Sequence, residues 1–166
     1  MKQVEVYFDY LCPYCYEGHK NLKELLPHHP DAAVVWMPCE AHPRPEQSKI
    51  YSDVAIMGMY FLRDNGGDVD RYNDLVYAAH FEKGLRIDDL EVLSAIAEKC
   101  GADPSAFREA VSNGRYAEAV LDGNRRAWGE KGWEAVPSYS GGGKDIGSRG
   151  GILVPKKELD RFLSEL

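Results

Sequence analysis

The stretch VEVYFDYLCPYC, residues 4–15, decides the fold of this chain. Residues 4–8 are rich in β-branched and aromatic side chains, which is typical of a buried strand. A turn at residues 9–11 follows, and Cys12-Pro13 is typical of a helix start because proline is favoured at the first helical position. Apolar residues at helical spacing continue the helix to about Leu26. The sequence therefore predicts a strand, a turn and a helix that carries two cysteines at its start.

The remaining elements predict two parts of the chain, one that contains all the strands and one that is entirely helical. The sheet part continues in a second strand, a strand entered through Pro137, a hairpin turn at Gly141-Gly142-Gly143 and a C-terminal helix. The expected elements are strands at 32–37, 135–140 and 144–146, and helices at 50–63, 69–81, 88–100, 104–113, 115–130 and 155–166. We therefore predict an α/β protein with a sheet domain formed by residues 1–46 plus 132–166, interrupted by an all-helical insertion domain at residues 47–131.

Cys12 and Cys15 form a pair with the spacing of redox-active thiols. Two intervening residues at a helix start place both thiols on one face, one turn apart, at a separation that suits a disulfide. Cys12 lies nearer the positive end of the helix, which favours thiolate over thiol. We therefore expect Cys12 to be the nucleophile and Cys15, one turn deeper, to be the resolving thiol.

A zinc site is the alternative interpretation of the same residues. Cys12, Cys15 and His19 have the spacing of a partial ligand set, but one helix would have to supply three ligands and the chain has no second Cys-x-x-Cys pair. We expect no bound metal. Cys39 and Cys100 are interpreted as buried thiols without a redox role.

Composition excludes several classes of protein. The 166 residues include 20 Lys and Arg against 27 Asp and Glu, a net charge of −7, which argues against nucleic acid or an anionic membrane as the main partner. No apolar run approaches the ~20 residues that span a bilayer, and no secretory leader is visible. Four cysteines are too few for a disulfide-built secreted domain. We therefore expect a cytoplasmic protein.

Residues 8–18 resemble the active-site segment of the DsbA-like thioredoxin-fold oxidoreductases, in particular the FrnE-type branch. That branch carries Phe-Asp, two further residues, Cys-Pro-aromatic-Cys-Tyr and a nearby glycine, as FDYLCPYCYEG does here. Residues 90–136 are similar to the helical insertion of the family, and Val136-Pro137 matches the end of that insertion. Pro38-Cys39-Glu40 followed by Pro43 is similar to the segment after the second strand.

The resemblance implies a thioredoxin fold in which the helical insertion caps the active site. It implies that the Val136-Pro137 peptide bond is cis and lies against the cysteine pair, with the Val136 backbone pairing with the substrate chain. Pro13 would also contact substrate, and Tyr14 either touches substrate or packs beside the motif. The acidic residue that periplasmic DsbA has six positions before its first cysteine falls on Val6, so Asp9 or Glu5 is the candidate proton shuttle. The alternative for Asp9 is a turn residue or a hydrogen-bonded group of the core.

The resulting prediction is a thiol–disulfide oxidoreductase that acts on protein or small-molecule thiols. It would need no cofactor other than its own Cys12–Cys15 disulfide, with glutathione as a candidate co-substrate and a separate reductant or oxidant to recycle it. Two other classes stay open. One is a glutathione-dependent enzyme of the 2-hydroxychromene-2-carboxylate isomerase or kappa transferase type, in which serine takes the position of Cys12. The other is a thiol-based metal-binding or sensor module.

Overall fold

A computed structural model describes residues 1–166, and contacts between residues group them into two units. The first unit consists of residues 1–41 and 123–166, and the second of residues 42–122. Whether the two are domains with boundaries at 46/47 and 131/132 stays a prediction. No helix is both long enough and apolar enough to cross a lipid bilayer.

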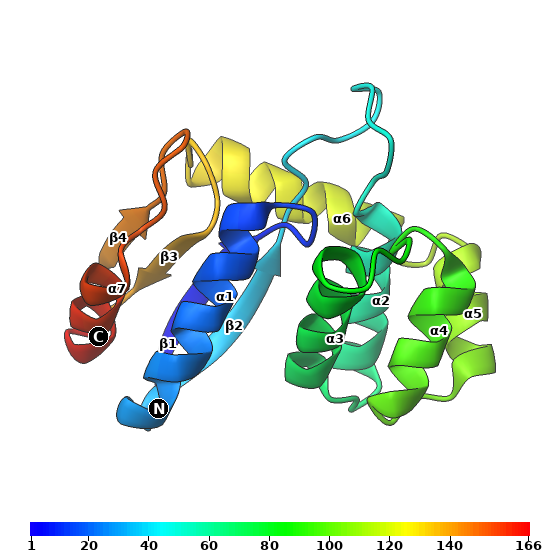
Figure 1. The fold of residues 1–166 in the computed structure, drawn as a ribbon, viewed down its shortest axis with the longest axis horizontal. Coiled ribbons are helices and arrows are strands. Elements are labelled where there is room, and N and C mark those ends of the chain that lie inside the picture. Colours follow the sequence, from blue (N-terminus) through cyan, green and yellow to red (C-terminus); the bar gives the residue numbers. More distant parts are fainter. The chain divides into compact units, whose positions relative to one another are not determined.

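The first unit contains a four-stranded mixed sheet (Figure 1). The strands are β1 (Lys2–Phe8), β2 (Ala32–Pro38), β3 (Ser138–Gly141) and β4 (Lys144–Gly147), in the order β2-β1-β3-β4. β1 pairs in parallel with β2 and antiparallel with β3, which pairs antiparallel with β4. Gly142 and Gly143 both have positive φ, at 59° and 76°, as a tight two-residue hairpin requires. The thioredoxin-like α/β sheet is therefore present as predicted.

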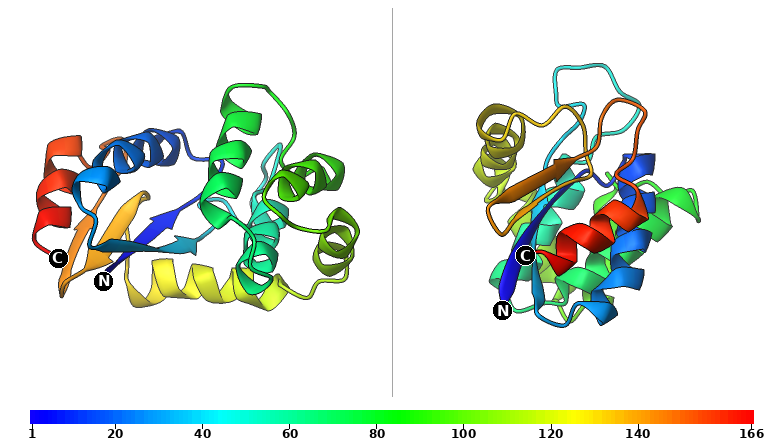
Figure 2. Two further views of the ribbon diagram at one scale, coloured as in Figure 1. Left: turned by 90° about the horizontal axis from the view of Figure 1, so that it is seen from below. Right: turned by 90° about the vertical axis from the view of Figure 1, so that its left-hand side faces the viewer.

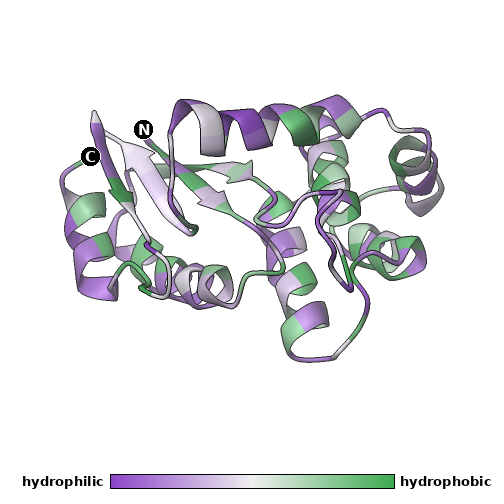
Figure 3. Ribbon diagram, turned by 90° about the horizontal axis from the view of Figure 1, so that it is seen from above, coloured by the Kyte–Doolittle hydropathy of each residue, from purple (hydrophilic) through white to green (hydrophobic).

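Side chains of β1 alternate between the two faces of the sheet, because successive strand residues point to opposite sides. Val4 and Val6 join a buried cluster with apolar residues of helices α1 (Pro13–Leu25) and α7 (Lys156–Ser164). Figure 2 shows these two helices on the same side of the sheet. In Figure 3 the helix beside the C-terminus is banded in hydrophobic and hydrophilic colours, as a helix with one buried face should be.

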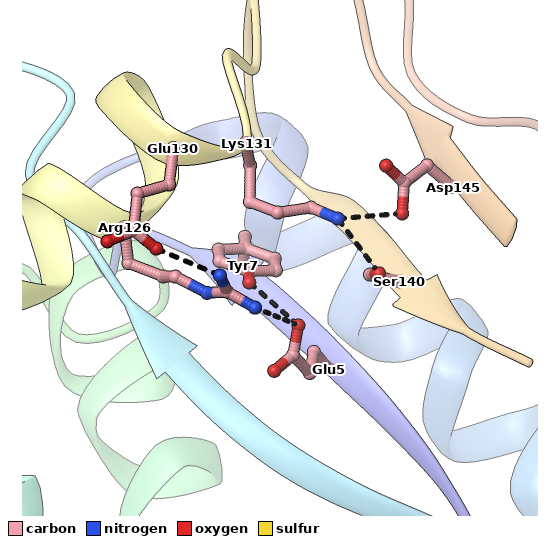
Figure 4. A network of polar contacts seen from close by, with 7 residues as sticks. All are labelled: Glu5, Tyr7, Arg126, Glu130, Lys131, Ser140 and Asp145. Carbon is pink, nitrogen blue, oxygen red and sulfur yellow. Dashed lines mark hydrogen bonds and ion pairs between the residues drawn. The ribbon is translucent and has the colours of Figure 1, made fainter. Parts of the chain in front are cut away.

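Glu5 and Tyr7 face the opposite side, toward the π-helix η2 (Arg125–Glu130) (Figure 4). The Tyr7 hydroxyl donates to Glu5 Oε1 over 2.8 Å, and Arg126 lies 3.6 Å from the same oxygen. Just after η2, Lys131 Nζ donates to Ser140 Oγ at 3.1 Å and lies 2.9 Å from Asp145 Oδ1. Polar contacts therefore fasten the segment that leads to Pro137 onto the sheet.

The second unit is helical and has an aromatic core. Tyr72 donates from its hydroxyl to the Ala55 carbonyl over 2.8 Å, and Phe107 packs edge-on against Phe61 with ring centroids 5.6 Å apart. A Cβ at Gly58 would lie 2.3 Å from the Tyr72 oxygen, so only glycine allows this contact. The helices are α2 (Asp53–Asp64), α3 (Val69–Phe81), α4 (Leu90–Lys99) and α5 (Pro104–Ser112). Helix α6 (Ala117–Asn124) runs across the division between the two units.

Three local expectations differ from the structure. The helix expected at 115–130 is divided into α6 and the π-helix η2, a change in winding that hydrophobic spacing does not encode. The strand expected from residue 135 begins at Ser138, because Pro137 has no N–H to donate to a sheet ladder. A cis peptide bond is expected only before Pro137, but the Arg44–Pro45 bond is cis as well.

Candidate active site at the start of helix α1

Cys12 is the N-cap residue of α1, and Pro13 follows at the first helical position. The Cys12 backbone is extended (φ −85°, ψ 119°), so its side chain turns back over the helix start. Its sulfur accepts a hydrogen bond from the Cys15 backbone N–H at 3.4 Å. The first-turn N–H groups, which have no carbonyl partner within the helix, therefore point at the Cys12 sulfur. A serine or aspartate oxygen more commonly serves as this cap.

These contacts lower the pKa of Cys12 from 9.0 to about 7. The largest cause is a hydrogen bond from the Cys15 thiol to the Cys12 sulfur; burial opposes it, and the backbone N–H groups of Cys15 and Tyr14 lower the pKa further. The negative charge of Asp9 raises it. A thiolate with a pKa near neutral pH combines a high ionised fraction with strong nucleophilicity.

Cys15 lies behind Cys12 in a much less accessible environment. Only 1% of Cys15 is exposed, whereas Cys12 is partly exposed. Burial raises the pKa of the Cys15 thiol well above 9.0, and so does its hydrogen bond to Cys12. The two thiols are therefore unequal, with one accessible and acidic and the other buried and protonated. This is the difference that the roles of nucleophile and resolving thiol require.

Asp9 connects the cysteine loop to the chain that leaves β2. Its carboxylate accepts from Leu11 N–H at 3.0 Å and from Ala41 N–H at 2.8 Å, and its own backbone N–H donates to Cys15 Sγ at 3.4 Å. The side chain is buried, and its charge raises the pKa values of Cys12, Cys15 and Cys39. A carboxylate in this position acts on every thiol of the site.

The segment that follows β2 also forms hydrogen bonds with residues of α6 and η2. Asn124 accepts from Glu40 N–H at 2.7 Å and donates to the Glu40 carboxylate at 3.0 Å. The Trp128 indole N–H donates to the Glu40 carbonyl at 2.9 Å. Sequence reasoning did not select Asn124 or Trp128, because these contacts join residues more than 80 positions apart.

The Val136–Pro137 peptide bond is cis, and it lies against the cysteine helix. The Cys12 thiol donates to the Val136 carbonyl over 3.7 Å. A Cβ placed on Gly18 of α1 would lie 2.7 Å from Pro137 Cγ, so the proline ring packs directly on the helix at that glycine. The structure therefore brings together Cys12, Cys15, Val136 and Pro137, although the two pairs are more than 120 positions apart in the chain.

Two further residues selected from the sequence have different surroundings. Tyr14, between the cysteines, is 44% exposed and so is available to a substrate. His19 is buried, and its ring lies 5.7 Å from that of Trp36. No group of three or more His, Cys, Asp or Glu side chains has an arrangement that could hold a metal ion. The buried thiols Cys39 and Cys100 are as expected from the sequence.

The sequence profile of the DSBA-like thioredoxin domain family matches residues 3–166. The chain belongs to the DSBA-like thioredoxin domain family. The DSBA-like chain is 27% identical to the uncharacterized protein YwbO of Bacillus subtilis (strain 168), over 94% of each sequence. The probable DsbA oxidoreductase SCO1869 of Streptomyces coelicolor has a similar structure, with a TM-score of 0.79 at 16% identity over 99% of this chain and 89% of that one. The cytosolic disulfide reductase DsbM of Pseudomonas aeruginosa has a TM-score of 0.75 at 16% identity over 98% and 97%.

The fold is shared with an enzyme of a different class. A 2-hydroxychromene-2-carboxylate isomerase has a TM-score of 0.73 at 18% identity over 98% of this DSBA-like chain and 93% of its own. The family and the thioredoxin fold predicted from residues 8–18 are thus confirmed, whereas the FrnE-type branch stays a prediction. Because one fold serves more than one reaction, the function has to be argued from the site.

Proposed function

We propose that this protein is a thiol–disulfide oxidoreductase in which Cys12 is the nucleophile and Cys15 the resolving thiol. The observation that carries the proposal is the inequality of the two sulfurs at the N-terminus of α1. Cys12 is accessible and its pKa is about 7, whereas burial raises the pKa of Cys15 well above 9.0. Substrate can therefore reach one sulfur only, and the second is positioned to attack the first.

In the reductive direction, the Cys12 thiolate attacks one sulfur of a substrate disulfide. A Cys12–substrate disulfide forms, the substrate S–S bond breaks, and the other substrate sulfur leaves as a thiolate. Cys15 then loses its proton and attacks Cys12, which releases the second substrate thiolate and leaves a Cys12–Cys15 disulfide. The protein supplies two electrons, and a separate thiol reductant must return them. The same steps in reverse oxidise a substrate dithiol, with an oxidant as the recycling partner.

Asp9 is the proposed acceptor of the Cys15 proton. The Asp9 side chain is buried, and its negative charge raises the pKa of Cys15. The backbone N–H of the same residue contacts Cys15 Sγ at 3.4 Å. That N–H would also stabilise the Cys15 thiolate as it forms. The proposed substrate contacts are Pro13 and Tyr14, which follow Cys12 in the chain, and Val136 and Pro137, because the Val136 carbonyl is 3.7 Å from the accessible sulfur.

In this proposal the substrates are protein or small-molecule thiols and disulfides, glutathione is a candidate co-substrate, and neither nucleic acid nor a membrane is a partner. A structure of DsbM is described with GSH, and that protein shares this fold. We also propose that the protein acts in the cytoplasm. The small number of cysteines and the structural similarity to the cytosolic reductase DsbM support this location. The isomerase alternative is disfavoured because Cys12, with Cys15 behind it, provides a complete two-electron pair.

The test is a titration of the purified protein against glutathione redox buffers, with the disulfide state read by mass spectrometry. We expect one reversible two-electron transition that disappears in Cys12→Ala and persists in Cys100→Ala, a matched removal of a buried thiol in the helical unit. Cys15→Ala should accumulate mixed disulfides, including a glutathione adduct on Cys12. Failure of the wild-type protein to form a Cys12–Cys15 disulfide under oxidising conditions would refute the proposal. Stoichiometric zinc on the two cysteines would instead support the metal-binding alternative.

A further inference from the structure

Two buried serine hydroxyls hold the loop that precedes β3. The Ser138 hydroxyl donates to the Ala135 carbonyl over 2.7 Å, and the Ser148 hydroxyl donates to the Pro137 carbonyl over 2.6 Å. Ser138 is 0% exposed and Ser148 is 4% exposed. Because buried carbonyl groups need partners, both hydroxyls contribute to one defined conformation of the loop.

The two serines also contact each other and the loop that follows β4. The Ser148 backbone N–H lies 3.3 Å from Ser138 Oγ and 3.3 Å from the Pro137 carbonyl. Ser148 Oγ accepts from the Val154 backbone N–H at 3.3 Å. Ser148 therefore joins two loops that are separated by the β3–β4 hairpin, and Ser138 accepts a hydrogen bond from the Ser148 backbone.

The carbonyl between the two bonded ones faces the nucleophile. Ala135 and Pro137 direct their carbonyls to the serines, whereas the Val136 carbonyl is 3.7 Å from Cys12 Sγ. The orientations of three consecutive carbonyl groups are coupled, because each neighbouring pair is related by the φ and ψ angles at the single Cα between them. Fixing the outer two therefore restricts where the middle one can point.

We propose that Ser138 and Ser148 are positioning residues that hold the Val136 carbonyl against the Cys12 sulfur and so restrain its ionisation. The inference rests on the proposed function, since it assigns a way of adjusting the nucleophile of that reaction. Neither serine touches the reacting sulfurs. They act through the backbone of residues 135–137.

The chemistry follows from the charge on a carbonyl oxygen. A protonated Cys12 can donate its S–H to the Val136 oxygen, whereas the thiolate has nothing to donate and faces a partial negative charge. The carbonyl therefore favours the thiol. It acts against the Cys15 thiol and the backbone N–H groups at the helix start, and in the same direction as the charge of Asp9. Cys39, buried just after β2, and Tyr14, two positions along the chain, are further titratable groups near Cys12.

The experiment compares Ser148→Ala and Ser138→Ala with the control Ser164→Ala, which removes an exposed hydroxyl bonded to the Arg161 carbonyl on α7. The readout is the pH midpoint of Cys12 alkylation in the reduced protein, located by mass spectrometry. We expect Ser148→Ala to lower the midpoint by roughly 0.5 unit, the size of one weak S–H···O contact, so that the ratio of thiolate to thiol rises about threefold at a given pH. Ser138→Ala should shift the midpoint in the same direction, and Ser164→Ala should leave it unchanged.

Thermal unfolding of each variant shows which of them fold. Ser148→Thr retains the hydroxyl and should keep the wild-type midpoint even if its added methyl lowers the melting temperature. If Ser148→Ala does not fold, Ser138→Ala and Ser148→Thr decide the question. An unchanged midpoint in a folded alanine variant, or a Ser148→Thr midpoint shifted as far as that of the alanine variant, overturns the inference. The proposed function fails separately, through the absence of a Cys12–Cys15 disulfide in the wild-type protein.

Discussion

Gly18→Ala tests how tightly the Pro137 loop is packed onto the cysteine helix. An added Cβ would lie 2.7 Å from Pro137 Cγ and 3.0 Å from the Tyr139 hydroxyl oxygen. Non-bonded carbon atoms settle about 3.5–4.0 Å apart, so the helix and the proline ring would have to separate by about 0.8 Å (3.5 minus 2.7). A proline ring cannot rotate out of the way as a flexible side chain could. The loop itself would have to move.

Two opposing effects set the change in the free energy of unfolding. Replacing glycine by alanine inside a helix stabilises it by about 0.5–1 kcal/mol. Overpacking a well-packed interior costs about 1–3 kcal/mol. Gly129→Ala in η2 isolates the first effect, because nothing lies within 4 Å of its added Cβ and its φ is not positive. We therefore expect Gly18→Ala to be about 1–3 kcal/mol less stable than Gly129→Ala.

The assay is thermal and chemical unfolding of the two variants beside the wild-type protein. For a chain of this size, 1 kcal/mol corresponds to about 2–4 °C in melting temperature, so the two variants should differ by roughly 2–12 °C. The rate of Cys12 disulfide exchange should change in Gly18→Ala only, because this substitution displaces the Pro137 loop, which holds the Val136 carbonyl near the Cys12 sulfur. Equal stability and equal exchange rates in the two variants would refute the packing argument.

Four other outcomes follow from the contacts of the cysteine site and of Lys131. Cys12 should be alkylated with a midpoint near pH 7, and a midpoint near pH 9 would contradict its role as an acidic nucleophile. Because folding lowers the pKa of Cys12 from 9.0, ionisation of this thiol stabilises the reduced fold fully above about pH 9, and the stabilisation is lost as the pH falls through 7. Cys15→Ala should raise that midpoint, since the Cys15 thiol is the largest cause of the lowered pKa; an unchanged alkylation profile would exclude that hydrogen bond. Asp9→Asn should lower the midpoint because it removes a negative charge, and a rise would show that the lost carboxylate hydrogen bond matters more. Lys131→Met should cost up to about 1 kcal/mol in urea unfolding, less at high salt, because it removes the contacts to Ser140 and Asp145; a loss independent of salt would argue against the ion pair.

Local chemistry made much of the sheet unit predictable. Strand residues 4–8 and the proline after Cys12 specify the start of α1 without reference to the rest of the chain, and the structure places Pro13 at its first helical position. The glycines at 142 and 143 likewise specify the hairpin between β3 and β4. Each of these signals is contained within a few residues, because it arises from backbone sterics and local hydrogen bonds.

Other features of the site carry no local signal. Ser148 lies in a glycine-rich segment that reads as an ordinary loop, and its importance appears only when its hydroxyl is found 2.6 Å from the Pro137 carbonyl. The π-helical winding of η2 accompanies contacts from Arg126 to β1 and from Trp128 to Glu40. Neither serine bonding nor helix winding follows from composition or hydrophobic period.

The spacing of Cys12 and Cys15 by itself determined that two thiols share one face at a helix start, and hence that a redox pair is expected there. Only the tertiary structure decided how the two thiols differ. Burial of Cys15 and the position of the Val136 carbonyl, 124 positions from Cys12, depend on segments that the fold brings together, and Asp9 is bound by Ala41 from the chain after β2. Ionisation depends on the surroundings of a sulfur in space, and those surroundings exist only once the sheet has brought these segments together.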